Sequence, residues 1–438
     1  MEIWKPHQKQ EKALLSTCFE TLYGGARGGG KTDAGMIWLL YDIQNPRYRA
    51  LVIRKNSDDL KDWIDRARRM YSGQNAEFVG HPAVVTFPSG AKIYTGHLKD
   101  ENAYTKYQGH EYQRMLVEEL TQIPSEDLYL KLISSCRTTV DGLMARIFAT
   151  TNPGGVGHNW VKRRFVDVSK DCKIHIDKIS KRSRVYIPAT VQDNPTLQAK
   201  DPSYILFLDS LAPDLRAQWR HGSWEQVKFK GQIYGDELNH AKESGRIYDF
   251  QADEYAETYA IFDLGKTQSD SMAITFAQQH KEQIKVIDYH ESYNKKWSFY
   301  AQLIKEKSFS CRRIVLPHDG TKRDGETLKS LKDFFEEEGF EVTVLVKTNS
   351  IPGDIQTVKT VFSRVHFASV QTIKLLEALE QYRYKWNDAL EVPSNEPEHN
   401  WTSHPADSFR YLCLFFELLK SLKKEVNTDN AWDNLGSV

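Results

Sequence analysis

Residues 25–32 contain the residue types of a phosphate-binding loop. They read Gly-Ala-Arg-Gly-Gly-Gly-Lys-Thr, which satisfies the pattern GxxxxGK[ST]. Glycines let backbone N–H groups curl around phosphates at the start of a helix. The lysine then reaches the β- and γ-phosphates, and the threonine hydroxyl ligates Mg²⁺. We therefore predict a nucleotide site formed by Gly25, Ala26, Arg27, Gly28, Gly29, Gly30, Lys31 and Thr32.

Two acids follow a short apolar run about 85 residues later, a spacing that suits such a site. Met115–Val117 reads as a buried strand, and Glu118 and Glu119 come directly after it. Glu118 would organise Mg²⁺, and Glu119 would position and polarise the attacking water. Taken alone, such a pair is also typical of a solvated helix start. Beside a phosphate-binding loop, it favours hydrolysis over phosphoryl transfer to a small acceptor.

A third polar segment, Thr150-Thr151-Asn152-Pro153, follows the strand predicted at Ile147–Ala149. Polar side chains at this strand end can sense hydrolysis at the γ-phosphate and couple it to movement. An Asn-Pro turn explains the same residues without any function.

The second half contains acids at the ends of predicted strands. Asp263 ends Tyr259–Phe262, Asp319 ends Ile314–Pro317, and Asp407 lies in the first turn of a helix predicted at Ala406–Leu419. Three converging carboxylates repel one another unless divalent cations sit between them, which is the two-metal arrangement for phosphodiester cleavage. Each aspartate alone is more typical of a cap or a turn. The rival acids are Asp270, Asp288 and Glu291.

Composition limits the possible classes of protein. The 438 residues balance 59 basic against 59 acidic side chains, which argues against a protein that coats nucleic acid but permits a local DNA track. No apolar run approaches the roughly 18 residues of a membrane helix. Five scattered cysteines without a CxxC pair suggest neither a disulfide scaffold nor a zinc site. Strands and helices alternate in both halves, which predicts helix-covered sheets.

A series of motifs resembles the large terminase subunit of tailed bacteriophages. Two of the longest are the run from Tyr23 to Thr32 and Thr151-Asn-Pro-Gly-Gly-x-Gly-His-x-Trp160. The others are Trp4-x-Pro6-His-x-x-Gln10, Tyr107-Gln-Gly109, Glu118-Glu119, Asp193-Asn-Pro195, Gly222-Ser-Trp224, Leu379-Glu-x-Tyr382 and Ser403-His-x-x-Asp407-x-x-Arg-Tyr411. The series is specific because it holds in order over nearly the whole chain.

The resemblance implies an α/β protein of two domains. Residues 1–225 would form a P-loop ATPase of the additional-strand, catalytic-glutamate type, with a mostly parallel sheet. Residues 241–423 would form an RNase H-like nuclease with a mixed sheet and helices. Residues 226–240 would be a linker, and 424–438 a mobile tail.

The resemblance also implies roles for single residues. Gln10 would contact the adenine of ATP, Arg27 would be a P-loop arginine acting in cis, and Thr151 and Asn152 would form the coupling motif. Asp263, Asp319 and Asp407 would bind two divalent cations, Mg²⁺ or Mn²⁺. Glu118 stands where many members carry aspartate. Candidates for a trans-acting arginine or lysine are Arg114, Lys106 and Arg137.

Three functions are compatible with these motifs. The first is a packaging motor that hydrolyses ATP to move double-stranded DNA into a procapsid and that cuts concatemers with a metal-dependent endonuclease. Its partners would be a terminase small subunit and the portal protein, and it would form a ring on the capsid, starting from a monomer in the host cytoplasm, away from membranes. The second is a helicase-type translocase with an inactive RNase H-like domain. The third is a non-enzymatic capsid-assembly adaptor; retention of Lys31, Glu119 and the three aspartates favours the first.

Overall fold

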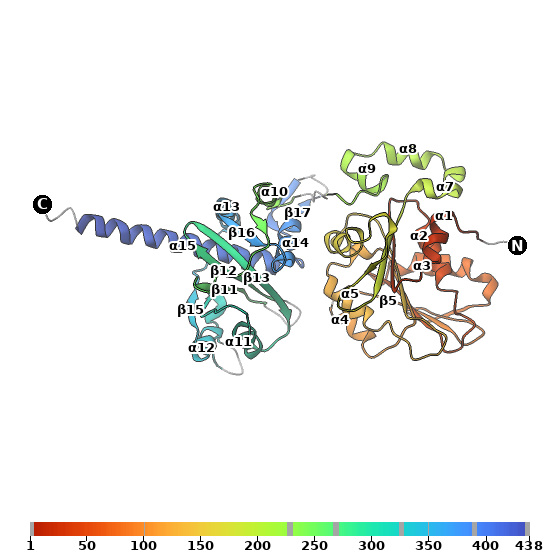
Figure 1. Ribbon diagram of the computed structural model, residues 1–438, viewed down its shortest axis with the longest axis horizontal. Helices are drawn as coiled ribbons and strands as arrows, with labels where there is room; N and C mark the ends of the chain where they lie inside the picture. Colours follow the sequence, from red (N-terminus) through yellow and green to blue (C-terminus); the bar gives the residue numbers. More distant parts are fainter. Residues whose placement is uncertain are drawn as a thin grey trace. The chain divides into compact units, whose positions relative to one another are not determined.

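A computed structural model describes residues 4–99, 101–225, 231–265, 271–323, 328–348, 350–387 and 392–433 of the chain. The chain divides into two compact units, Met1–Val227 and Lys228–Val438 (Figure 1). Each unit is built around one central sheet that is covered by helices on both faces.

Within the described residues, the first unit has a nine-stranded sheet in the order β3-β4-β5-β2-β6-β7-β1-β9-β8. The pairs from β5 to β9 are parallel, and only the outer pairs β3–β4, β4–β5 and β8–β9 are antiparallel. The strands are β1 (Glu20–Gly25), β2 (Arg49–Arg54), β3 (Glu77–Val79), β4 (Val84–Thr86), β5 (Lys92–His97), β6 (Arg114–Val117), β7 (Arg146–Thr151), β8 (His175–Ile176) and β9 (Ser183–Ala189).

Strand β7 lies between β1 and β6 and is parallel to both. Ala149 is paired with Leu22 on one side and with Val117 on the other. The strand that leads into the glycine loop is therefore separated by one additional strand from the strand that leads into the two glutamates. This confirms the predicted additional-strand class, and it brings the carboxyl ends of all three strands to one edge of the sheet.

Helices cover both faces of this sheet because each has one apolar side. Helices α1 (Gln8–Leu14), α2 (Lys31–Trp38) and α3 (Leu60–Met70) pack on one face, and α5 (Glu126–Ile133) and α6 (His158–Val161) on the other. Helix α5 begins where the Ser125 side chain accepts a hydrogen bond from the Leu128 amide. The remaining helices are α4 (Glu101–Tyr104), α7 (Pro195–Lys200), α8 (Ser203–Asp209) and α9 (Pro213–Trp219), the last three of which gather at one end of the unit (Figure 1).

The second unit has a mixed sheet of seven described strands in the order β10-β16-β13-β12-β11-β14-β15. Strand β12 is antiparallel to both β11 and β13, whereas β14 and β15 continue parallel to β11. This central order is that of an RNase H-like fold, as predicted. The strands are β10 (Ile247–Tyr248), β11 (Thr258–Asp263), β12 (Ser271–His280), β13 (Gln283–Tyr293), β14 (Arg313–Leu316), β15 (Glu341–Val344) and β16 (Val365–Ala368), with a separate hairpin of β17 (Tyr384–Asn387) and β18 (Val392–Pro397).

Two helical layers enclose this second sheet. The long helix α15 (Ser403–Asp433) buries Phe409, Leu412, Cys413 and Phe416, whose spacing defines one helix face. Helices α10 (Gly235–Glu243), α13 (Ile351–Phe362) and α14 (Ile373–Gln381) share its core, and α11 (Trp297–Lys305) and α12 (Leu331–Glu337) cover the opposite face.

The structure differs from the sequence prediction at two boundaries. Ile233, Tyr234 and Leu238 were expected in the linker 226–240, but they are buried in the core of the second unit. These apolar residues directly follow a polar stretch, so the sequence pattern assigned them to the linker as well. Helix α15 continues to Asp433, through most of the predicted tail 424–438, whose residues 434–438 lie outside the described residues.

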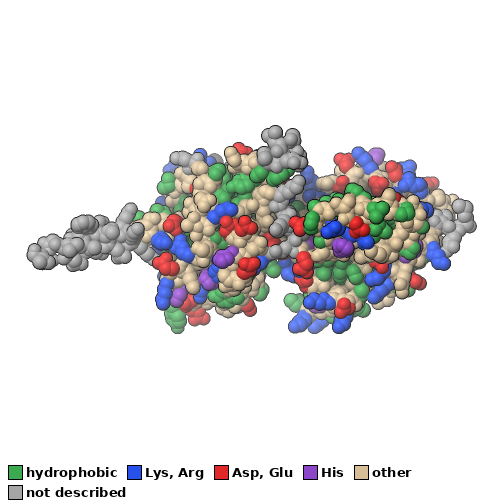
Figure 2. Space-filling model, turned by 90° about the horizontal axis from the view of Figure 1, so that it is seen from above, with side chains coloured by type: hydrophobic (Ala, Val, Ile, Leu, Met, Phe, Trp, Pro, Cys, Tyr) green, Lys and Arg blue, Asp and Glu red, His purple; other side chains and the backbone are tan. Residues whose placement is uncertain are grey.

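The surface of the described residues is mixed in charge (Figure 2), and their helices are not strongly apolar. None of their helices combines the length and the apolar character that crossing a membrane requires. On the face shown in Figure 2, basic and acidic side chains are interspersed on each unit. This mixture agrees with the balanced charge of the sequence.

Candidate nucleotide site and acidic cluster

The glycine loop joins the end of β1 to the start of α2. Gly25 has a φ of 126°, and a Cβ atom there would lie 2.6 Å from the carbonyl oxygen of Ala189. A side chain is therefore excluded by backbone conformation and by space. Gly30 precedes Lys31 in a left-handed conformation with a φ of 67°, so that α2 begins at the lysine. The first amides of α2 thus face the loop, as phosphate binding requires.

Lys31 is directed back into its own loop. Its Nζ atom donates to the carbonyl oxygen of Ala26 at 2.6 Å and to Oδ1 of Asn152 at 2.9 Å. Burial, followed by the charge of Arg27, lowers the pKa of Lys31 to about 8. The ammonium group is held by neutral oxygens, so an anionic phosphate would be a stronger partner than those it has.

Glu118 is buried at the end of β6 and forms an ion pair with Arg54, with 2.6 Å between Nη2 and Oε2. Burial raises the pKa of Glu118, while Arg54 and a hydrogen bond from Thr32 act in the opposite direction. Both contacts of Arg54 go to Oε2; Oε1 is buried with no good hydrogen-bond partner among the described residues. A buried carboxylate oxygen beside the Thr32 hydroxyl fits a hard cation such as Mg²⁺.

Glu119 has a different environment from its neighbour. Its side chain is exposed, and its backbone is left-handed with a φ of 53°. A non-glycine residue in that region is strained by about 1–3 kcal/mol, and such strain collects at functional sites. With this backbone conformation, the Glu119 side chain is exposed to solvent, whereas the neighbouring Glu118 side chain is buried in the interior.

A hydroxyl network joins this strand end to the next one. The Thr121 Oγ1 lies 2.8 Å from Oγ1 of Thr151 and donates to the carbonyl oxygen of Asn152 at 2.9 Å. The Thr121 amide also donates to Oγ1 of Thr151 at 3.1 Å. Because Asn152 also accepts from Lys31, one chain of contacts links the lysine, the β7 end and the segment after Glu119.

Gln10 and Arg27 contact other protein groups in this structure. Gln10 is buried; its Nε2 donates to the Gly30 carbonyl at 2.8 Å, and its Oε1 accepts from the His7 amide at 2.8 Å. Arg27 is exposed and stacks on the ring of Trp219. The adenine-binding role of Gln10 stays a prediction; the structure shows it bracing the loop.

Sequence reasoning gave no role to three residues that contact the loop. Asn194 donates from Nδ2 to the Gly28 carbonyl at 2.8 Å, and Trp219 and Gly222 lie against Arg27 and Ala26. Asn194 and Gly222 lie in the motifs Asp193-Asn-Pro195 and Gly222-Ser-Trp224. The sequence of a motif does not reveal which residues it contacts in the fold. Trp219 had no sequence signal.

The candidates for a trans-acting residue separate by exposure. Arg114 is buried, pairs with Asp42 at 2.7 Å and lies 4.5 Å from the Trp38 ring centre, so it is occupied within its own unit. Lys106 and Arg137 are exposed. The burial of Arg114 therefore favours Lys106 and Arg137 over it as candidates for the trans-acting residue.

Asp263 and Asp407 lie together in the second unit. Asp263 ends β11, and its Oδ2 is 2.6 Å from Nδ1 of His404 in the first turn of α15. Asp407 lies one turn later and pairs with Arg410 at 2.8 Å. Burial raises the pKa of Asp263 to about 7, with the charge of Asp407 adding to the effect, and burial also raises the pKa of Asp407.

The two described rival acids, Glu291 and Asp288, have different partners. Glu291, on β13, accepts from Ser271 and Tyr289, and burial raises its pKa against the opposing charge of His404. Asp288 instead pairs with Lys307 at 2.6 Å. Of the rivals, Glu291 is therefore near the Asp263 site and Asp288 is engaged elsewhere, while Asp270 lies outside the described residues.

Asp319 follows β14 in a short turn, residues His318–Thr321. Strands β11 and β14 are parallel and adjacent, with Ile261 paired to Val315, so their carboxyl ends share one edge of the sheet. No hydrogen bond or ion pair of its side chain is found among the described residues. Within them, no group of three or more His, Cys, Asp or Glu is arranged closely enough to hold a metal ion, so the three-aspartate ligand set stays a prediction.

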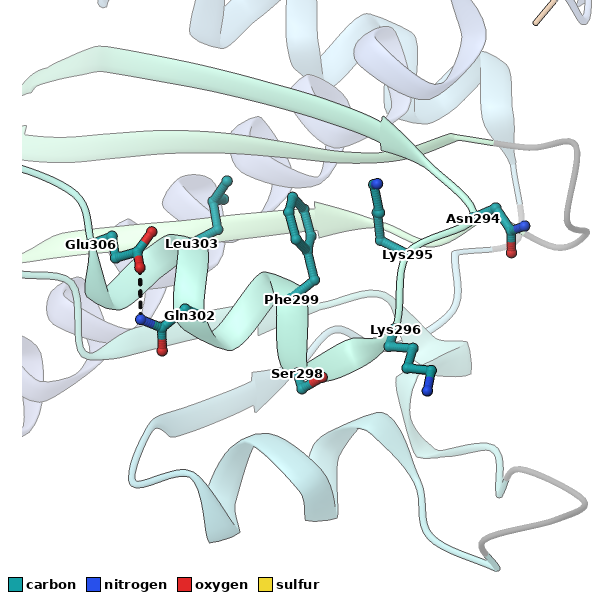
Figure 3. A pocket seen from close by; sticks show the side chains of 8 residues that line it. All are labelled: Asn294, Lys295, Lys296, Ser298, Phe299, Gln302, Leu303 and Glu306. Carbon is teal, nitrogen blue, oxygen red and sulfur yellow. Dashed lines mark hydrogen bonds between the residues drawn. The ribbon is translucent and has the colours of Figure 1, made fainter. Parts of the chain in front are cut away.

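One hollow of about 470 Å³ lies elsewhere on the second unit (Figure 3). It is formed by the segment before α11 and by the helix itself, and Gln302 Nε2 donates to Glu306 Oε1 at 2.7 Å at its edge. Its lining residues are Asn294, Lys295, Lys296, Ser298, Phe299, Gln302, Leu303 and Glu306. No predicted site residue is among them.

Comparison with known families agrees with this geometry. Residues 18–220, which carry the whole nucleotide site except Gln10, match the family described as phage terminase large subunit. The matched stretch is just under half of the chain. The resemblance drawn from the motifs of the sequence is therefore confirmed.

Solved large terminases resemble the chain at low identity. The large terminase of a thermophilic bacteriophage is 15% identical over 94% of this chain and 98% of its own, with a TM-score of 0.42. That of bacteriophage HK97 is 10% identical over 92% of each chain, with a TM-score of 0.42. The nuclease domain of the bacteriophage SPP1 large terminase, solved with bound Mn, is 17% identical over 38% of this chain and 92% of its own, with a TM-score of 0.28. Functionally curated proteins include no match to this chain.

Proposed function

We propose that this terminase is a DNA-packaging motor subunit with two active sites. The first unit hydrolyses ATP to translocate double-stranded DNA into a procapsid, and the second cleaves concatemeric DNA. One observation supports the motor function above the others: the contact of Lys31 with Asn152, the residue directly after the additional strand β7. It joins the residue that would bind phosphate to the segment that would report hydrolysis.

The residues of the first unit suit ATP hydrolysis. The loop amides and Lys31 bind the phosphates, and Glu119, exposed beside them, accepts a proton from the attacking water. Thr32 and Glu118 would hold Mg²⁺, which neutralises charge on the β- and γ-phosphates. Burial raises the pKa of Glu118, and the ion pair with Arg54 opposes this effect and so favours the ionised carboxylate. Arg27 lies where it can contact a phosphate oxygen.

The acids of the second unit suit a metal-dependent nuclease. Asp263 is buried and Asp407 lies partly buried near it, and burial raises the pKa of both carboxyl groups, so that bound cations would favour their ionised forms. Asp263, Asp319 and Asp407 would hold two divalent cations, Mg²⁺ or Mn²⁺, which activate water and stabilise the leaving oxygen of a phosphodiester. His404, whose Nδ1 lies 2.6 Å from Oδ2 of Asp263, would orient that carboxylate. Among the solved relatives, the SPP1 nuclease domain contains Mn.

DNA, a terminase small subunit and the portal protein are the proposed partners. A motor must grip any sequence, so we expect its contacts to go mostly to phosphates and its affinity to fall steeply with salt. We further propose that copies of the chain assemble as a ring on the capsid from a monomer in solution.

A paired assay tests this proposal. Phosphate release and plasmid nicking are followed on the full chain with Mg²⁺ or Mn²⁺, with and without a small subunit and empty procapsids. We expect ATPase activity to rise with these partners and nicking to require the metal. ATPase stimulation by single-stranded DNA alone, without any nicking, would instead indicate the helicase-type translocase. Absence of both activities would indicate the assembly adaptor.

A further inference from the structure

The last residue of α9 holds the arginine of the nucleotide loop in two ways. The guanidinium carbon of Arg27 lies 3.3 Å from the centre of the Trp219 ring. The Arg27 amide also donates to the Trp219 carbonyl oxygen at 2.8 Å. Side chain and backbone therefore dock on the same residue, which fixes where the guanidinium rests.

The guanidinium rests there without a counter-charge. No carboxylate pairs with Arg27 in the described part of the chain, and its nearest charged neighbour in the loop is the ammonium group of Lys31. Two cations held side by side create a field that attracts an anion. The face of an indole ring holds a cation only weakly at an exposed site, whereas a phosphate binds a guanidinium through two hydrogen bonds.

The end of α9 also contacts both halves of the nucleotide site. At Gly222, where φ is 67°, a Cβ atom would lie 2.6 Å from the Ala26 amide nitrogen, so the chain passes directly against the loop. At Gly154, a Cβ atom would lie 2.8 Å from Oε1 of Gln218. If Arg27 moves, the end of α9 loses a contact with the nucleotide loop, and this helix end also contacts the segment after Asn152.

We propose that Trp219 is a positioning residue that holds Arg27 beside the nucleotide loop and releases it to the phosphates when ATP binds, so that α9 senses whether the triphosphate is bound. The inference rests on the proposed ATPase function and extends it to a residue outside the loop. The guanidinium group loses little free energy when it leaves the indole ring, because a phosphate anion binds it more strongly. Trp219 touches no substrate itself, so its removal should affect the catalytic step more than nucleotide binding.

The test compares Trp219→Ala and Trp219→Phe with Trp297→Phe, a matched tryptophan change in α11 of the second unit. We expect Trp219→Ala to lower kcat for ATP about fivefold, while the Kd for ATPγS changes by less than about twofold. Trp219→Phe should restore kcat to within about twofold, because a phenyl face also attracts a guanidinium. Trp297→Phe should leave both quantities unchanged.

Tryptophan emission supplies the second readout. ATPγS should alter the emission of the unchanged protein and of Trp297→Phe, and this response should disappear in Trp219→Phe and in Arg27→Gln. Adenosine, which has no phosphates, should produce none of it.

Three results would overturn the inference: an unchanged kcat in Trp219→Ala, an emission response that survives in Trp219→Phe, or an ATPγS affinity in Trp219→Ala as low as in Lys31→Ala. Any of these in a protein whose unaltered form hydrolyses ATP contradicts only the role of Trp219. Failure of the unaltered protein to bind ATPγS contradicts the ATPase function as well.

Discussion

Lys31 begins the helix that follows strand β1, and Asp263 ends strand β11, but the surroundings of the two charged groups differ. Lys31 is held by two neutral oxygens, and the acid that would share its Mg²⁺, Glu118, is paired with Arg54. Asp263 and Asp407 instead have a histidine and one arginine to offset them, and burial raises the pKa of both acids.

The difference indicates what each site still needs. The nucleotide site is braced by its own hydrogen bonds, so its shape is set before a ligand arrives. In the acidic cluster, burial disfavours the ionised forms of Asp263 and Asp407, so these forms depend on cations from solution. If this contrast holds, ATP binding should tolerate the loss of single acids, whereas DNA cleavage should not.

The largest expected effect separates binding from turnover in the first unit. Glu119→Gln keeps the size of the side chain but cannot take a proton, so ATP turnover should fall about 10²- to 10⁴-fold while ATPγS still binds. Lys31→Ala should lose turnover and also weaken binding, because it removes a positive charge from the phosphates. Phosphate release and ATPγS titration measure both. Equal loss of affinity in the two variants would contradict the assignment of Glu119.

The next effect tests the independence of the two sites. Asp263→Asn or Asp407→Asn removes a negative charge from a site proposed to hold cations, so plasmid nicking should fall more than about a hundredfold. ATP hydrolysis by the same full-length variants should stay near that of the unaltered chain, since the nucleotide site contains neither residue. A folded Asp263→Asn variant that lost both activities would refute the two-site arrangement.

A smaller effect decides which further acid serves the second site. Glu291 lies on the α15 side of the sheet with Asp263, whereas Asp288 pairs with Lys307 on the other side. We expect Glu291→Gln to lower nicking about tenfold and Asp288→Asn to change it by less than about twofold. The same nicking assay should include Asp319→Asn, because Asp319 is the third proposed metal ligand. Nicking that survived Asp319→Asn and Glu291→Gln but not Asp288→Asn would reverse the order.

The smallest expected effect concerns stability alone. Arg114→Met breaks the pair with Asp42, of which the arginine is buried and the aspartate partly exposed, so the free energy of unfolding should fall by about 1–3 kcal/mol. ATPase activity per folded molecule should not change. The exposed Arg137→Ala is the control, with an expected change within about 0.5 kcal/mol. Denaturant titration measures the free energy of unfolding, and a separate phosphate-release assay measures ATPase activity. If Arg114 acted in trans, its replacement would instead lower turnover about a thousandfold and leave stability unchanged.

Several parts of the fold followed from local patterns. The glycine loop between β1 and α2 was predictable because phosphate binding restricts both residue type and spacing. The acids after Val117 and at the end of β11 were predictable because a polar residue directly after an apolar strand marks the edge of a sheet. The predicted linker was too long because Ile233 and Tyr234 are buried by partners distant in sequence.

The sequence by itself determined which residues are able to do chemistry: a lysine after glycines, two glutamates after a strand, and aspartates at strand ends. Only the tertiary structure decided which of them meet. It placed β7 between β1 and β6, stacked Arg27 on Trp219, and buried Arg114 against Asp42. It also put Glu291, rather than Asp288, on the face of the second sheet that carries Asp263, with His404 acting on both acids. The physical reason is that strand order and helix packing bring together residues far apart in the chain, and neither charge pairing nor burial can be read from spacing alone.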